Sequence, residues 1–210
     1  QPPRRVAEGA HDRRSWHEHL IARWVKDNPP VDGNGWEPYP VSLRIVNWIK
    51  WSLNGEALSP SVLESLALQA RFLRGRLEYH ILANHLMANA KSLIFAGTFF
   101  DGEESEEWLR TGLALLQREI AEQVLHDGGH FELSPMYHCI VLEDLLDLIN
   151  VFRTYSLDVP LHLEEAASRM TGWLQVMCHP DGGTPLFNDA AFGVAPTPQS
   201  LFRYADKLGI

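Results

Sequence analysis

Two pairs of neighbouring polar residues are the strongest candidates for chemistry in this chain. Asn84-His85 and Tyr137-His138 each stand where a loop enters an apolar segment with helical spacing. An amide, a phenol and several imidazoles could therefore converge at one end of a helical assembly. Such a set would suit the removal of a proton next to a carboxylate, with side chains acting as general acids and bases.

Asn84 has two interpretations. The simpler one is a polar helix start in which Asn84 is the N-cap. If a helix already exists at His80, then His80, Asn84 and Lys91 share one helix face. In the second interpretation, an amide and an imidazole at a helix N-terminus bind a carboxylate, aided by free backbone N–H groups.

Tyr137 lies in an unusually dense group of titratable residues. A lone tyrosine is usually an amphipathic core residue whose hydroxyl finds one partner. Tyr137, however, follows a Ser-Pro stop and comes shortly after His130 and Glu132. A phenol has an ordinary pKa of about 10 and needs nearby cations or donors before it can act as a base near neutral pH. We expect His138, His130 or Arg44 to supply them.

The histidines and Glu132 do not have the spacing of a metal site. No pair among His85, His130, Glu132 and His138 matches the tight spacing of a zinc motif. We therefore expect neither a metal nor another cofactor.

Aromatic residues divide between core and surface roles. Trp48 and Trp51 lie in a helical pattern and are expected to fill the core, whereas loop-borne Trp36 and Tyr39 are candidate stacking platforms for sugar rings.

Asp189 ends a glycine-rich loop and is a candidate for the rim of a pocket. The acidic residues Glu143, Asp144 and Asp147 are interpreted as a solvated helix face.

The apolar pattern predicts an all-α protein. Apolar residues recur at helical spacing in nearly every long segment, and alternation with period two is almost absent. The expected helices are Arg14–Lys26, Val41–Leu53, Ser61–Arg76, His85–Ala96, Glu104–Val124, Met136–Tyr155 and Leu161–Met177, with Ser59 and Pro160 near helix starts.

Glycine-rich connections repeat along the chain and predict a repeating architecture. Three of them begin at Asp32, Asp127 and Asp181, and each opens another element. Inner helices that begin near Pro40, Asn84, Pro135 and Phe187 would be separated by about one helical hairpin each. A solenoid and an α/α toroid both fit. We favour an incomplete toroid over residues 1–210, because long aromatic and His-rich loops resemble a pocket rim.

Composition excludes several classes of protein. With 210 residues, 45% of them hydrophobic, the chain can bury one sizeable core, and Cys139 and Cys178 fit buried positions without a disulfide framework. The net charge of −9 argues against nucleic acid or an anionic membrane surface as a partner. No apolar run is long enough for membrane insertion, and the first residues lack both a Met and a signal-like core, so we expect a piece of a longer protein.

Three ordered motifs give the chain a family resemblance. They are Trp36-Glu-Pro-Tyr-Pro-Val-Ser-Leu-Arg44-Ile-Val-Asn47-Trp48, then His80-x-x-x-Asn84-His85-Leu-x-x-Asn89, then Asp127-Gly-Gly-His-Phe-Glu-x-Ser-Pro-Met-Tyr137-His138. Together they resemble the heparinase II/III family of polysaccharide lyases over nearly the whole chain. The resemblance implies the helical toroid half of an enzyme whose C-terminal half is a β-sandwich.

The resemblance also implies roles for individual residues. Asn84 matches the residue that neutralises the uronic-acid carboxylate, His85 its neighbour, and Tyr137 the catalytic phenol. A His or Tyr from the β domain would complete the pair, so this chain alone would be inactive or badly impaired. The partner implied is an acidic polysaccharide, and the location a Gram-negative periplasm or the outside of the cell. Expected substrate contacts come from Trp36, Tyr39, Arg44, His80, His130, Glu132 and His138.

Two alternatives remain open on the sequence. A glycoside hydrolase on an α/α toroid would need two carboxylates facing the cleft, for which Asp127, Glu132 and Asp189 are the candidates. A glycan-binding helical-repeat protein without turnover would use the same aromatics and histidines, because fold alone does not fix function.

Overall fold

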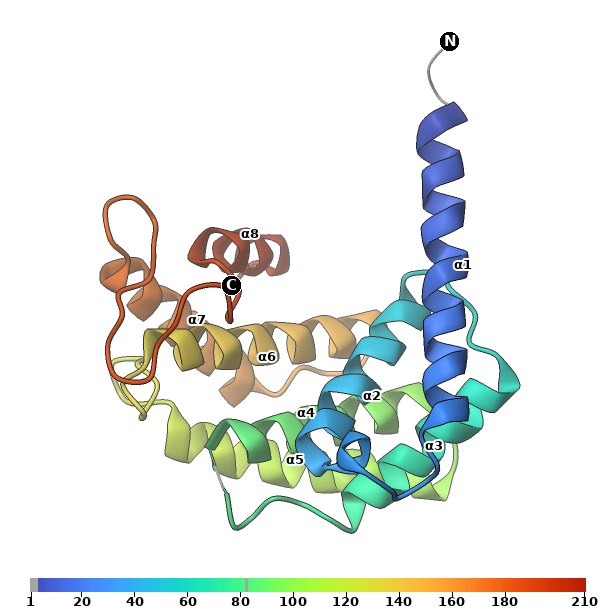
Figure 1. Ribbon diagram of the computed structural model, residues 1–210. Helices are drawn as coiled ribbons and strands as arrows, with labels where there is room; N and C mark the ends of the chain where they lie inside the picture. The colour runs from blue at the N-terminus through green and yellow to red at the C-terminus, as the bar shows by residue number, and fades with distance from the viewer. Residues whose placement is uncertain (1–3, 82) are drawn as a thin grey trace.

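The computed structural model describes the backbone of residues 4–81 and 83–210, with side chains from residue 14 onward except residue 82. The described part is helical, with no β-strand and a single isolated bridge between Val124 and His130, so the all-α prediction is confirmed. Its elements (Figure 1) are α1 Arg4–Asp27, the 3-10 turn η1 Asn34–Trp36, α2 Pro38–Leu53, α3 Pro60–Arg74, α4 Ala83–Phe99, α5 Glu103–Gln123, α6 Pro135–Thr154, α7 Leu161–Met177 and α8 Pro198–Leu208.

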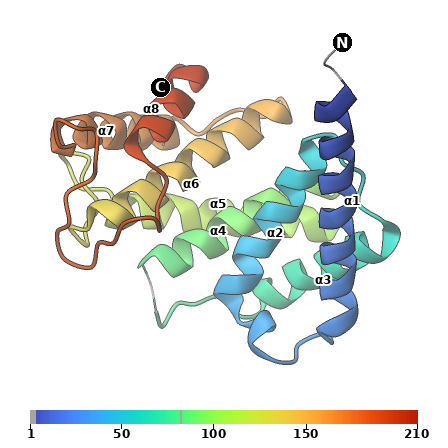
Figure 2. The ribbon, with the colours of Figure 1, turned by 45° about the horizontal axis from the view of Figure 1, so that its top comes forward.

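The helices form two layers. α2, α4, α6 and α8 pack against one another in that order, and α3, α5 and α7 cover them from one side as the second helix of each hairpin. Figure 2 shows α2, α4 and α6 side by side, with α7 and α8 at the end of the row. This is the arrangement expected of an incomplete α/α toroid. The fourth inner helix differs from the prediction, because it begins at Pro198 and not near Phe187.

Most helix boundaries agree with the expected ranges, and two differ. α1 begins at Arg4, ten residues before the expected start, and its N-terminal half extends beyond the helices that it packs against (Figure 1). α8 lies outside the seven expected helix ranges and begins later than the inner helix that was expected near Phe187. It follows a long segment rich in Gly and Pro, yet it has the start signal of a proline after a capping hydroxyl, since Thr197 Oγ1 accepts a hydrogen bond from the Ser200 N–H at 3.3 Å.

A tryptophan cluster joins the first elements of the fold. The ring of Trp24 on α1 lies 5.6 Å from that of Trp48 on α2 and 6.1 Å from that of Trp36 in η1, and Trp36 contacts Phe72 on α3 edge to face at 5.4 Å. The guanidinium of Arg44 lies over Trp24, 3.7 Å from the ring centroid. These contacts hold α1, α2 and α3 together around one apolar centre.

Helices α4 and α5 approach closely because each helix presents a glycine to the other. A Cβ on Gly97 of α4 would lie 2.5 Å from the backbone nitrogen of Leu109, and one on Gly112 of α5 would lie 2.7 Å from Ile94 Cγ1. The two helices therefore pack backbone against backbone over much of their length. This packing fixes the position of α4, which is buried on nearly all sides.

A buried ion network ties α4 to α6, α2 and α8. Lys91 Nζ donates to Asp144 Oδ1 at 2.7 Å and to Asp147 Oδ2 at 2.5 Å, Lys50 pairs with the same Asp147 oxygen, and the Tyr204 hydroxyl donates to Asp147 Oδ1 at 3.0 Å. The expectation that Asp144 and Asp147 form a solvated face is wrong, because both are buried. Burial alone would lower the pKa of Lys91, but the two carboxylates raise it above its ordinary value.

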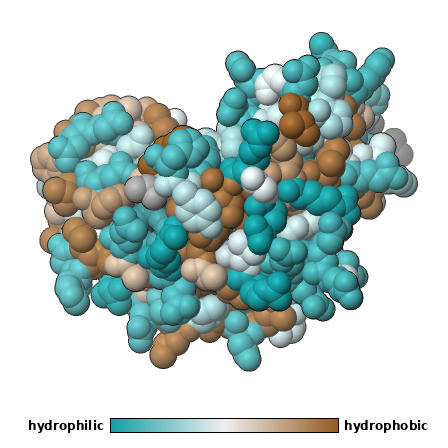
Figure 3. Space-filling model, turned by 90° about the horizontal axis from the view of Figure 1, so that it is seen from below, coloured by the Kyte–Doolittle hydropathy of each residue, from teal (hydrophilic) through white to brown (hydrophobic). Residues whose placement is uncertain are grey.

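The outer surface is mixed in character. Hydrophilic residues cover most of the face seen from below in Figure 3, and hydrophobic residues are scattered among them. Among the described residues, no helix has both the length and the apolar character needed to cross a bilayer.

Replacing Gly97 by alanine should separate α4 from α5. The added methyl meets backbone, which cannot rotate away, so we expect a loss of about 1–3 kcal/mol in the free energy of unfolding. Gly172→Ala is the control, because nothing lies within 4 Å of a Cβ there and helix propensity alone predicts a gain of up to about 1 kcal/mol. Chemical denaturation of both variants measures the difference, and equal stabilities would contradict the close packing.

Removing the buried lysine should cost far more than removing a surface one. Lys91→Met leaves Asp144 and Asp147 buried without their main partner, which predicts a loss of about 3–5 kcal/mol in the free energy of unfolding. Arg71→Met breaks an exposed pair with Glu104 and should leave the unfolding midpoint nearly unchanged. A Lys91 variant as stable as the parent would show that the network is not needed to hold α4 against α6.

Candidate active site

The polar cluster lies at the N-terminal ends of three inner helices. Tyr39 is the second residue of α2, Asn84 the second of α4, and Tyr137 the third of α6. The rings of Tyr39 and His85 stack with centroids 4.3 Å apart and planes at 27°. Burial raises the pKa of Tyr39, and Asp144 and Tyr137 add to the rise, while an interaction with the Asn84 side chain works against it. The structure thus brings Tyr39, Asn84, His85 and Tyr137 together.

Asn84 lies at the very start of its helix. α4 begins at Ala83, so Asn84 stands inside the first turn, where backbone N–H groups have no partner within the helix. His80 is exposed in the turn before α4, so the expected helix face shared by His80, Asn84 and Lys91 does not exist. The side chain of Lys91 instead belongs to the buried ion network.

Two loops that are far apart in the sequence are tied together beside Tyr137. Asn188 Nδ2 donates to the carbonyl oxygens of Leu133 at 2.9 Å and Glu132 at 3.3 Å, and Ser134 Oγ donates to the Asp189 carbonyl at 3.3 Å. The Tyr137 hydroxyl donates to Asp189 Oδ2 at 3.4 Å. Asp189 therefore lies at the edge of the cluster.

Carboxylates, and not cations, surround the Tyr137 phenol. Partial burial raises the pKa of Tyr137, and Asp189 and Glu132 raise it further. The pKa of Glu132 is itself raised, first by burial and then by Asp189, while His85 opposes the rise. The neutral phenol is therefore the stable form of Tyr137 in this chain.

Two histidines that lie near Tyr137 in the sequence, His130 and His138, point into the core. His130 is 1% exposed with Nε2 3.0 Å from Gln123 Oε1, and His138 is 0% exposed with Nε2 3.0 Å from the Met170 carbonyl oxygen. Burial lowers the pKa of each to about 4, so both are neutral near pH 7. The expectation that they contact substrate or supply positive charge to Tyr137 is wrong, because both side chains are enclosed by protein.

Arg44 and Trp36 also serve packing. Arg44 Nε donates to Gln69 Oε1 at 2.7 Å and its guanidinium lies over Trp24, and burial lowers its pKa to about 10. Trp36 is 3% exposed in the tryptophan cluster. Trp36 cannot meet a sugar ring in this structure, so its expected substrate contact is corrected to interhelical packing. Arg44 is only partly buried, so its expected substrate contact stays a prediction. Of the two aromatic residues that the sequence placed in a loop, Tyr39 is the one that lies in the polar cluster.

Glu78 is a site residue that the sequence did not indicate. Its carboxylate Oε1 lies 3.0 Å from His85 Nδ1, and Oε2 accepts a hydrogen bond from Asn89 Nδ2 at 2.9 Å. Asn89 also donates to Ser42 Oγ at 3.0 Å on the helix that carries Tyr39. Glu78 precedes α4 in an irregular turn, where no periodicity predicts burial, so this contact had no signal in the sequence.

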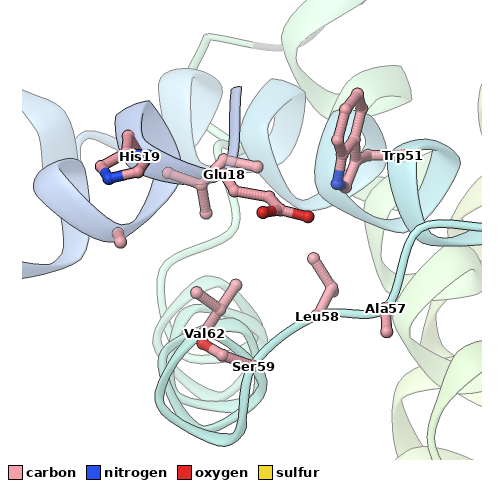
Figure 4. A pocket seen from close by; sticks show the side chains of 9 residues that line it. Glu18, His19, Trp51, Ala57, Leu58, Ser59 and Val62 are labelled. Atoms are coloured by element: carbon pink, nitrogen blue, oxygen red, sulfur yellow. The ribbon is translucent and has the colours of Figure 1, made fainter. Parts of the chain in front are cut away.

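One of two cavities described here adjoins the polar cluster. One of about 370 Å³ opens beside Tyr39 and is lined by α2, α4, α6 and by Val194 and Pro196 of the last loop. Another of about 410 Å³ lies between α1, Trp51 of α2 and the start of α3, and its lining includes Glu18 and Leu58 (Figure 4). Only the first contains a member of the polar cluster. Within the described ranges, no group of three or more His, Cys, Asp or Glu side chains could hold a metal ion.

Comparison with known proteins gives a consistent result. The family model described as heparinase II/III N-terminus matches residues 7–205. A heparin-sulfate lyase of Pedobacter heparinus is 30% identical over 192 residues, which cover 84% of this chain and 29% of the relative. A heparin-sulfate lyase of Bacteroides thetaiotaomicron is 27% identical over 198 residues, covering 84% of this chain and 28% of the relative.

A solved structure supports the same fold. The crystal structure of heparinase III superposes on 93% of this chain and 32% of its own with a TM-score of 0.75, at 24% sequence identity. The chain thus spans less than a third of the length of the curated relatives described above.

Asp189→Asn should lower the pKa of the Tyr137 phenol. The change removes a negative charge and a carboxylate acceptor that both favour the neutral phenol, so the phenolate becomes easier to form. An NMR titration of tyrosine ring carbons, assigned by comparison with Tyr137→Phe, measures the shift. Asp158→Asn, on an exposed loop residue, is the control. A Tyr137 pKa that stays constant or rises would contradict the described contact.

Proposed function

The chain belongs to the heparinase II/III N-terminus family, and on this premise we propose that it is the helical part of a polysaccharide lyase. The reaction is β-elimination at a uronic-acid residue of an acidic glycosaminoglycan. The observation that carries the proposal is the convergence of Asn84, His85 and Tyr137 at the N-terminal ends of α4 and α6. Relatives that carry the name heparin-sulfate lyase make a heparan-sulfate type of polymer the first substrate to test.

Asn84 and His85 bind the substrate carboxylate in this proposal. Asn84 offers an amide N–H₂, and the first turn of α4 adds backbone N–H groups and the positive end of the helix dipole. Removal of the C5 proton places negative charge on the carboxylate oxygens. Donors that already point at these oxygens strengthen their hydrogen bonds as the charge develops, which lowers the barrier.

Tyr137 acts as the proton donor to the leaving oxygen. A base takes the C5 proton, the C5–H electron pair forms the C4–C5 double bond, and the C4–O4 bond breaks as O4 receives a proton. The carboxylates beside Tyr137 favour its neutral form, which has a proton to give. We assign the base to a His or Tyr of a C-terminal β-sandwich domain, which the greater length of the relatives supports.

The location proposed for the protein follows from its substrate. A glycosaminoglycan polymer does not cross a membrane unaided, so we propose that the protein works in the periplasm or outside the cell.

One observation favours a second candidate, a glycoside hydrolase. Glu132 and Asp189 both influence the pKa of Tyr137, and Asp189 raises the pKa of Glu132, as expected of a general acid next to an ionised carboxylate. The product separates the two reactions, since elimination leaves an unsaturated uronate and hydrolysis leaves a saturated reducing end.

Tyr137→Phe and Asn84→Ala should each abolish most turnover in the full-length protein. We expect Tyr137→Phe to lower kcat by about 10²–10⁴-fold, the range of general acid–base catalysis, and Asn84→Ala by about 10²–10³-fold. Ultraviolet absorbance of the unsaturated product measures both, over heparan sulfate and other acidic polysaccharides. Tyr155→Phe, at the opposite end of α6, is the matched control and should keep full activity.

Three outcomes are informative. Absorbance that disappears in both variants and persists in the control supports elimination at this site. Full turnover in both variants would refute the assigned roles. Saturated products that disappear in Glu132→Gln would replace the lyase by the hydrolase.

A further inference from the structure

We propose that Glu78 is a positioning residue that fixes the tautomer of His85, and through it the group that meets the substrate carboxylate. The proposal deepens the lyase assignment and rests on it for the effect on turnover. Its structural part concerns which ring nitrogen of His85 carries a proton, and this can be measured without any substrate.

The carboxylate of Glu78 is held rigidly. Glu78 is 4% exposed, and its backbone N–H donates to Asn89 Oδ1 at 2.9 Å while its Oε2 accepts from Asn89 Nδ2 at 2.9 Å. The second Asn89 donor reaches Ser42 Oγ at 3.0 Å. Because Asn89 Oδ1 is occupied by a backbone donor, the amide orientation is determined, and its Nδ2 must face the carboxylate.

The remaining carboxylate oxygen determines the proton on His85. Glu78 Oε1 lies 3.0 Å from His85 Nδ1, and an ionised carboxylate can only accept a hydrogen bond. Nδ1 must therefore carry the proton. In the neutral ring Nε2 is then the acceptor, and in the charged ring Nε2 is a second donor. Both forms leave Nε2 for contacts outside the pair, and the His85 side chain is 31% exposed.

The ring is held in place as well as in its protonation state. It stacks on Tyr39 at 4.3 Å between centroids, and α2 carries both Tyr39 and the Ser42 that anchors Asn89. A buried carboxylate on one side and an aromatic face on another give His85 one orientation. An imidazolium that is paired with a carboxylate and has Nε2–H free can bind a second carboxylate, namely that of the uronate.

Glu78→Gln inverts this arrangement with almost no change in shape. Asn89 Nδ2 still needs an acceptor, so it retains the glutamine oxygen and turns the glutamine N–H₂ toward His85. A donor that faces Nδ1 forces this nitrogen to be the acceptor. The proton then moves to Nε2 in the neutral ring, and the charged ring loses its partner and gains an unfavourable donor.

The tautomer is measured by NMR of ring nitrogens in full-length protein labelled with ¹⁵N-histidine. His85 is assigned by the signals that disappear in His85→Gln, and the spectra are recorded at a pH where the ring is neutral. The parent and Glu78→Asp should show a protonated Nδ1, and Glu78→Gln a protonated Nε2. A parent His85 protonated on Nε2 would overturn the proposal, even if the Gln variant failed to fold.

Turnover tests the functional part. We expect Glu78→Gln to lower kcat/KM about 10–100-fold, because the imidazolium form of His85, which donates from Nε2 to the uronate carboxylate in this proposal, loses its carboxylate partner, with partial recovery in Glu78→Asp. Glu104→Gln removes an exposed glutamate that pairs with Arg71 on the surface and should leave kcat/KM unchanged.

The two proposals fail in different ways. A parent protein with the protonated Nδ1 but no unsaturated product refutes the lyase and leaves the structural role of Glu78 supported. A parent that is active as a lyase, with a Gln variant of inverted tautomer and unchanged kcat/KM, refutes the functional role of Glu78 and leaves the lyase intact.

Discussion

The buried pair between Lys91 and Asp144 sets the register on which the rest of the site depends. Lys91 lies seven residues after Asn84 on α4, and Asp144 lies seven residues after Tyr137 on α6. Seven residues are about two helical turns, or roughly 10 Å of rise. An ion pair at the same depth in both helices aligns their N-terminal ends, so that the amide and the phenol lie at one level. A slip of one turn would separate them by about 5 Å.

This arrangement explains why charge is buried here at all. Burying a lysine and two aspartates costs solvation energy, and apolar residues of similar volume often give equal or greater stability. Apolar packing between α4 and α6, however, would tolerate more than one register. The Lys91 ammonium donates to two carboxylates, and Lys50 and the Tyr204 hydroxyl also donate to one of them, Asp147. Such a set of directed hydrogen bonds forms in only one register. We infer that the network is maintained for position more than for stability.

The sequence predicts helices well and side-chain surroundings poorly, for a physical reason. Helix starts depend on local chemistry, such as Ser134 before Pro135, where the hydroxyl accepts from the Tyr137 N–H, and α6 begins within one residue of its expected start. The surroundings of His138 depend on α7, since its partner is the carbonyl of Met170. The sequence predicted a solvated Asp144 because its partner Lys91 is distant in the sequence and the pairing could not be foreseen.

In the candidate site, too, local features could be predicted from the sequence and contacts between separate segments could not. Asn84, His85 and Tyr137 could be identified because each stands near a helix start, and inner helices of a repeat begin at the same end. Glu78 could not, because it lies in an irregular turn and acts across that turn on His85. The family resemblance likewise pointed to the motif that contains His130 and His138, but it did not indicate that both imidazoles are enclosed by protein.

The negative charge of the chain determines how the proposed site binds its substrate and which role Tyr137 takes. The substrate is anionic, the chain has a net charge of −9, and carboxylates surround Tyr137. This site therefore cannot hold the uronate by a general positive field. In the proposed reaction the uronate is instead held by directed donors, which are the Asn84 amide, the first-turn N–H groups of α4 and the His85 ring that Glu78 orients. The same carboxylates keep the phenol protonated. A site with donors and a proton to give, but with its phenol disfavoured as a base, supplies in this proposal the hydrogen bonds to the carboxylate and the general acid of the elimination, and the proposal assigns the C5 proton to a base from the expected β-sandwich domain.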